Sequence, residues 1–305
     1  LLDSDLLDRR AKYFALFLQD DWKVTRNLTL NLGLRWEAHT PKFDANNRLN
    51  GFDPLAINPV SGTPGVITFA GLNGAGRQLY NGDWNNFMPR IGLAWKPLGR
   101  SGTVIRAGSG VFFGVPLPGS NNNSAGFAAQ ADFSTPDNGI TAPFLLKDGL
   151  PGGLTSPQLG PAYGAVRVGQ PAALNLDFVE TERRLGYTLQ WNFSIQQDAG
   201  RNSTVEVSYL GAVGHKLNGP NTNINQVRPE LMGPGNAQSL RPFPQFGNVS
   251  KVTPMWGNSS YHGVNFKFEK RFSDGINLLA NYTFSKFIDD VPAGQEIGAT
   301  PGMQN

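Results

Sequence analysis

The chain has 305 residues, of which 39% are hydrophobic and only 16% are charged; it has no cysteine and a formal net charge of +3. The lack of cysteine excludes disulfides, thiolate metal sites and a cysteine nucleophile. The mild charge argues against nucleic-acid binding, and no run of roughly 18 apolar residues predicts a transmembrane helix.

Four pairs of strand-like segments follow one another along the chain. Each pair is joined by a short connector of turn-forming residues, such as Ser273-Asp274-Gly275-Ile276 in the last pair. Such a pair with such a connector predicts a β-hairpin. The four predicted hairpins lie near 12–38, 88–113, 184–213 and 260–288.

Long segments separate these hairpins, at 39–87, 114–183 and 214–259, and they carry most of the 37 glycines and 22 prolines. Loops of this length are uncommon in compact soluble domains. Short turns that alternate with long loops are typical of bacterial outer-membrane barrels, in which the short turns are periplasmic and the long loops extracellular.

Alternation within the segments supports this interpretation. Leu28, Leu30, Leu32, Leu34 and Trp36 alternate with polar residues or glycine, and the segments 187–196 and 264–269 repeat the pattern. Successive side chains of a strand point to opposite faces. Each strand therefore has one apolar and one polar face, and the i, i+3, i+4 spacing of an amphipathic helix is missing.

A soluble β-sandwich would also show alternation, but two details favour a membrane barrel. The segments are longer than the globular mode of about 5–6 residues and match the roughly 9–11 residues of a tilted membrane strand. Aromatic residues also gather toward the segment ends, as in the girdles of membrane barrels. The predicted girdle residues are Trp22, Trp36, Trp95, Tyr187, Tyr261 and Phe272.

No pattern of residues predicts catalysis, a cofactor or a metal site. The three histidines are scattered, and neither H-x-H nor H-E-x-x-H occurs. No G-x-S-x-G is present for a serine nucleophile. Arg183 and Arg184 precede an apolar strand, where they are interfacial charges or contacts for lipopolysaccharide phosphates.

The stretch Gln19-Asp20-Asp21-Trp22, followed by Leu28 to Glu37 (LTLNLGLRWE), resembles a barrel hairpin of TonB-dependent outer-membrane receptors. Residues 89–95 and 281–286 resemble later barrel strands of that family, and the nearest subgroup is the Oar-like receptors. The resemblance implies a barrel of about 22 strands plugged by an N-terminal domain. It also implies import of a large scarce solute (a siderophore, vitamin or glycan) energised through TonB.

We therefore expect residues 1–305 to form one antiparallel β-barrel segment of about eight strands, an interior piece of a larger barrel in the outer membrane. Its expected partners are outer-membrane lipid, lipopolysaccharide, an unknown solute and, through an N-terminal part that includes the plug, the TonB complex. No plug domain or TonB box is found in the chain. Three loop aromatics are candidate ligand contacts: Trp84, Trp256 and Phe243.

Two alternatives have different consequences for the structure. A soluble all-β carbohydrate-binding or surface adhesion module would fold without an amphiphile. A complete eight-stranded barrel with a structural or adhesive role would close through pairing of 12–23 with 277–288.

Overall fold

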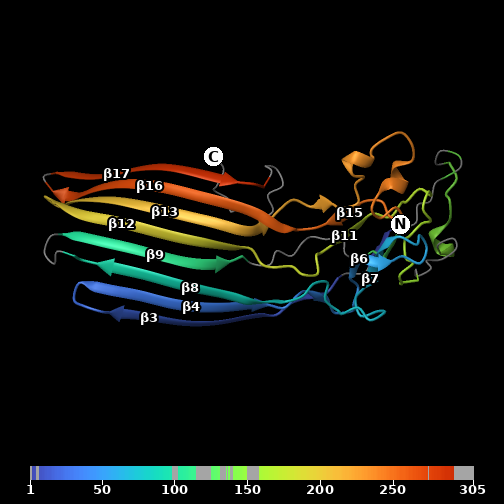
Figure 1. Ribbon diagram of the computed structural model, residues 1–305, viewed down its shortest axis with the longest axis horizontal. Helices are drawn as coiled ribbons and strands as arrows, with labels where there is room; N and C mark the ends of the chain where they lie inside the picture. The colour runs from blue at the N-terminus through green and yellow to red at the C-terminus, as the bar shows by residue number, and fades with distance from the viewer. Residues whose placement is uncertain are drawn as a thin grey trace.

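The computed structural model describes residues 2–4, 7–97, 102–114, 125–130, 135, 137, 140–149, 158–273 and 275–291. Eight long strands form one antiparallel sheet in the order β17-β16-β13-β12-β9-β8-β4-β3 (Figure 1). These strands are β3 (Tyr13–Lys23), β4 (Leu28–His39), β8 (Asp83–Trp95), β9 (Thr103–Phe113), β12 (Tyr187–Gly200), β13 (Ser203–Asn218), β16 (Met255–Ser273) and β17 (Ile276–Asp289). The prediction of an all-β antiparallel fold with about eight strands is confirmed.

The two strands of each hairpin are joined by a short connection at one end of the sheet. Figure 1 shows the long connections between hairpins gathered at the other end. The turn between β12 and β13 illustrates why these connections are short. Arg201 and Asn202 both have positive φ, at 51° and 57°. Two such residues make the hairpin turn whose twist matches that of the flanking strands.

The register of the sheet separates an apolar face from a polar face. Cross-strand partners lie on the same face, and Leu30 pairs with both Trp22 and Leu93. Along β13, Val207 pairs with Ile195 and with Phe266 in the same way. The apolar face is exposed to a degree unusual for a soluble protein, and Phe284 is 69% exposed. A soluble sandwich would bury these side chains, so their exposure favours the membrane barrel over that alternative.

Charged residues on the apolar face lie near strand ends. Among the described residues, Asp20, Lys270 and Lys286 are the acidic and basic side chains that the register places on this face. Each stands three positions before the last residue of its strand. From there a charged group can extend to the polar boundary of an apolar layer while its stem stays within it.

The long connections contain a folded unit, which we call the loop body. It is built from the hairpin β6 (Asn50–Ile57) and β7 (Pro64–Phe69) and from the sheet β11-β15-β14 (Leu176–Phe178, Val249–Lys251 and Thr222–Asn223). Two short strands, β1 (Leu2–Ser4) and β2 (Arg9–Arg10), precede β3. Further short elements of the connections are β5 (Phe43–Asp44), β10 (Ala128–Gln130) and the 3₁₀ turns η1 (Leu146–Asp148), η2 (Pro229–Leu231) and η3 (Ala237–Leu240). None of the described residues forms a helix long and apolar enough to cross a membrane.

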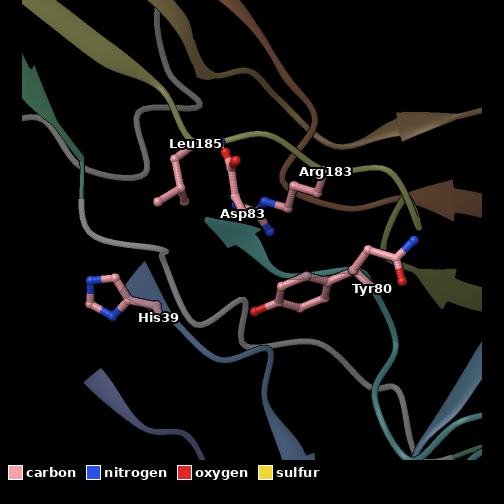
Figure 2. A pocket seen from close by; sticks show the side chains of 6 residues that line it. His39, Tyr80, Asp83, Arg183 and Leu185 are labelled. Carbon is pink, nitrogen blue, oxygen red and sulfur yellow. Dashed lines mark hydrogen bonds between the residues drawn. The ribbon is translucent and has the colours of Figure 1, made fainter. Parts of the chain in front are cut away.

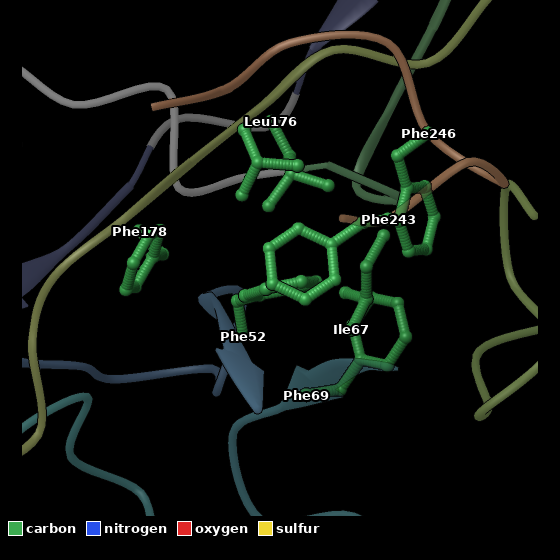
Figure 3. Close-up of a cluster of buried hydrophobic side chains, with 8 residues drawn as sticks. Phe52, Ile67, Phe69, Leu176, Phe178, Phe243 and Phe246 are labelled. Carbon is green, nitrogen blue, oxygen red and sulfur yellow. The ribbon is translucent and has the colours of Figure 1, made fainter. Parts of the chain in front are cut away.

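A phenylalanine-rich core holds the loop body together (Figure 3). Phe52 packs edge-on against Phe243, with ring centroids 5.0 Å apart. All three long connections contribute to this core, so segments far apart in sequence are tied to one another. Its buried members are Phe52, Ile67, Phe69, Leu176, Phe178, Phe243, Phe246 and Val249.

Gly65 illustrates how closely the loop body is packed. Its φ is +106°, and a Cβ at this position would lie 2.7 Å from Phe243 Cδ1 and 3.0 Å from Phe52 Cζ. We expect Gly65→Ala to lower the stability of the loop body by about 1–3 kcal/mol, from backbone strain and overpacking. Thermal unfolding should show the loss, whereas Gly62→Ala, with positive φ but open space, should lose less; equal losses would rule out the packing contribution.

The two edge strands of the sheet, β3 and β17, lie at opposite ends of the strand order. Within the described part of the chain, neither pairs with a further strand on its outer side. The closure between 12–23 and 277–288 that a complete eight-stranded barrel needs is therefore not found among these residues. A membrane cannot tolerate such open edges, so the sheet is part of a larger barrel.

Candidate functional site at the polar face and its loop end

The polar face of the sheet carries charges that are paired along and across strands. Arg35 pairs with Glu37 and also donates from Nη2 to the Tyr13 hydroxyl at 2.8 Å. Glu269 lies between two cations, with Lys267 Nζ at 3.0 Å and Arg271 Nε at 3.3 Å. Partly exposed pairs of this kind contribute little stability, and they make this face of the sheet charged.

Glycine on β9 makes room for an arginine on this face. The Arg90 guanidinium lies 4.9 Å from the centre of the Phe112 ring. A Cβ on Gly110 would lie 3.2 Å from both Arg90 Cγ and the Phe112 ring. Gly110 therefore lets Arg90 lie flat beside the strand, where a cation over an aromatic face is favourable.

A small pocket lies where the polar face meets the loop end (Figure 2). His39 ends β4 and pairs across the sheet with Asp83, the first residue of β8. The Asp83 carboxylate accepts from Arg184 Nη1 at 3.0 Å and from the Leu185 backbone N–H at 2.9 Å. These bonds bring residues 183–185 against the sheet, and the pocket is lined by His39, Tyr80, Asn81, Asp83, Arg183 and Leu185.

Arg183 points into this pocket instead of toward the lipid boundary that the sequence suggested (Figure 2). It is 9% exposed, and desolvation lowers the pKa of its guanidinium. Arg184 is the half-exposed member of the pair and is bound to Asp83. Sequence reasoning missed His39, Tyr80 and Arg183 as neighbours, because they meet only where β4 pairs with β8 and Asp83 binds Arg184 and Leu185.

Four of the predicted girdle residues lie on the apolar face. Trp22 pairs with Leu30, Trp95 with Leu28, and Tyr187 with Phe113. Trp36 pairs with Phe87, and its indole N–H donates to the Trp84 carbonyl at 2.7 Å. These positions fit an aromatic girdle, which stays a prediction.

Tyr261 does not lie on the face that the girdle prediction requires. It pairs with Ala212 and Phe287, on the face that also carries Asn265 and Lys267. Its ring lies over Gly263, whose Cβ would be 2.7 Å from the Tyr261 hydroxyl. Tyr261 therefore belongs to the polar face, and the side chain of Phe272, the sixth predicted residue, lies outside the described part of the structure.

The three candidate ligand aromatics do not form one site. Phe243 is 7% exposed and packs inside the loop-body core, so it offers no free ring face to a solute. Trp84 and Trp256 are 50% and 42% exposed, and each ring lies over a glycine, Gly82 and Gly219 respectively. They stand on β8 and β16, four positions apart in the sheet, or about 19 Å at the usual strand spacing.

The described residues contain no cluster of three or more histidine, cysteine or acidic side chains suited to a metal ion. Long antiparallel strands, one apolar and one polar face, and two open edges define part of the wall of a transmembrane β-barrel. The family model described as an outer membrane beta barrel domain matches residues 3–305. The chain belongs to this family, which places it in the outer membrane.

Solved structures to which the chain is similar are receptors of the outer membrane. The alcaligin receptor FauA from Bordetella pertussis is 12% identical (TM-score 0.41), and the match covers 92% of this chain and 31% of that chain. The ferripyoverdine receptor of Pseudomonas aeruginosa is 12% identical (TM-score 0.42), and the match covers 94% of this chain and 24% of that chain. The siderophore receptor PirA of the same organism is 10% identical (TM-score 0.36), and the match covers 92% of this chain and 43% of that chain. This chain thus spans between about a quarter and two fifths of their lengths. No curated protein matches it.

Proposed function

We propose that this chain forms part of the barrel wall and outer loops of a TonB-dependent receptor that imports a large scarce solute. The polar face lines the lumen, and the loop body stands over its extracellular mouth. The apolar face contacts outer-membrane lipid and lipopolysaccharide, with Trp22, Trp36, Trp95 and Tyr187 at the headgroups. The TonB complex acts on a part of the receptor outside this chain.

The observation that carries this proposal is the folded loop body at one end of an open-edged sheet. A barrel large enough to need more than these strands encloses a wide lumen. A structured body over such a lumen can select a solute, which short periplasmic turns cannot do. The Gln19 to Glu37 hairpin, which resembles TonB-dependent receptors, supports the same conclusion.

A growth experiment tests the proposal in the organism that carries the gene. A strain that lacks the receptor gene and a strain depleted of TonB are each supplied with ferric siderophores, cobalamin or oligosaccharides as the limiting nutrient. We expect both strains to fail on the same nutrient, and the full-length gene to restore growth only in the strain that lacks the receptor gene. Normal growth of the receptor-deletion strain on every nutrient, together with loss of surface adhesion, would favour the adhesion alternative.

A further inference from the structure

The Arg183 guanidinium is the one group of the pocket whose charge has no partner of opposite sign among the described residues. Its Nη1 donates to Thr253 Oγ1 at 2.8 Å, and Nη2 lies 3.3 Å from Met255 Sδ. Its Nε is buried and has no hydrogen-bond partner within the described part of the chain. The centre of the Tyr80 ring lies 5.9 Å from the guanidinium carbon, so the contacts of this buried charge are a hydroxyl, a thioether and an aromatic face. A buried charge without an anionic partner is costly.

The carboxylates near Arg183 are engaged elsewhere. Asp83 shares the pocket, but it binds Arg184 and the Leu185 N–H. Glu182, the preceding residue, accepts from Asn81 Nδ2 at 2.6 Å. Neither carboxylate is within ion-pair distance of Arg183 in this structure, and Arg183 forms no ion pair with any described residue.

A second cation strengthens the positive field around the pocket. Burial lowers the pKa of the Lys42 amine, and the charges of Arg9 and Arg183 lower it further. Lys42 therefore lies close enough to Arg183 for their charges to interact unfavourably. An anion beside Arg183 would supply the missing partner of opposite charge and would offset this repulsion.

We propose that Arg183 binds an oxyanion, a carboxylate or phosphate group of the solute, at the extracellular mouth of the lumen. Nε and the adjacent Nη2 form the fork that suits a planar or tetrahedral oxyanion. The rings of His39 and Tyr80 and the side chain of Leu185 supply the mostly apolar walls of a ligand pocket. This inference rests on the proposed function, because it assumes that a solute reaches the pocket.

The test is anion binding by the full-length receptor, purified in detergent, with citrate and inorganic phosphate as probes at constant ionic strength. We expect calorimetry to show binding of at least one probe, weakened at least tenfold in Arg183→Gln and partly retained in Arg183→Lys. Arg228→Gln, an exposed arginine of the same connections, is the matched control and should bind as the wild type does. Equal affinity of Arg183→Gln and wild type, or no binding of either probe, would overturn the proposal.

A second measurement uses the wild-type receptor alone and so does not depend on the folding of a variant. Phenylglyoxal modifies arginine, and mass spectrometry locates the modified residue. We expect modification of Arg183 that the binding probe suppresses, with modification of Arg228 unaffected. If Arg183 never reacts and the receptor also binds no probe, a carboxylate from another segment of the receptor fills the pocket, and the proposal is overturned. Such a result leaves TonB-dependent growth intact, so the two proposals fail separately.

Discussion

Asn225→Leu is expected to unfold the loop body while the eight-stranded sheet stays folded. Asn225 is fully buried. Its Nδ2 lies 2.9 Å from the Phe243 carbonyl, 3.1 Å from that of Phe246 and 2.7 Å from that of Gly247. Its Oδ1 accepts from the Phe243 N–H at 2.8 Å. One side chain thus satisfies the backbone of the turn that places two core phenylalanines.

Leucine has the branched shape of asparagine but is larger and offers these groups no partner. Each buried polar group left unpaired costs about 1–3 kcal/mol, so we expect a total loss of at least about 4 kcal/mol. Limited proteolysis should then cut the 214–259 connection at low protease, with cuts located by mass spectrometry. The control is Asn236→Leu, where an exposed asparagine caps a 3₁₀ turn through the Gln238 N–H, and a loss near 1 kcal/mol is expected. Equal protease resistance of Asn225→Leu and wild type would refute this role.

The strands could be predicted from sequence because alternation is a local signal. The segment from Leu28 to Trp36 shows it fully, and β4 runs from Leu28 to His39. Strand ends were harder to predict, and β16 begins at Met255, five residues before the predicted start at 260. Irregular register near Leu217 and Asn218 lets β13 and β16 pair beyond the alternating part, and a bulge of this kind breaks the period-2 pattern.

Tyr261 is an error that the sequence itself could have prevented. Val264, Phe266 and Phe268 place the apolar face on even-numbered positions of this strand, and Tyr261 is odd-numbered. It was predicted as a girdle residue because it lies near a strand end. Position along a strand, however, does not determine which face of the sheet a side chain is on. The parity of each residue is the better guide.

The loop body and the pocket could not be predicted, because their contacts are distant in sequence and follow no period. Phe52 and Phe243 stand far apart in two segments rich in glycine and proline. Phe243 was predicted to contact a ligand, because the local sequence of a long loop does not distinguish an exposed aromatic residue from a buried one. Arg183 faces His39 and Tyr80 only because Asp83 ties the start of β8 to the segment before β12.

Val207→Arg is expected to prevent stable insertion of the receptor in the outer membrane. Val207 pairs with Ile195 and Phe266 on the apolar face. It lies four residues from the start of β13, about halfway along the roughly 9–11 residues that cross the bilayer. An arginine facing lipid at this depth costs about 2–4 kcal/mol in a membrane barrel.

The neighbouring residue provides a matched control in the same strand. Ser208 pairs with Ser194 and Asn265 on the polar face, where an added arginine meets a hydrated lumen, so Ser208→Arg should fold as the wild type does. The measurement is folding of the full-length receptor into lipid vesicles, followed by gel mobility before and after heating and by denaturant titration. If the sheet instead lies in a soluble module, the two arginines will have similar effects and neither will depend on lipid. If the faces are reversed, Ser208→Arg will be the variant that fails to insert.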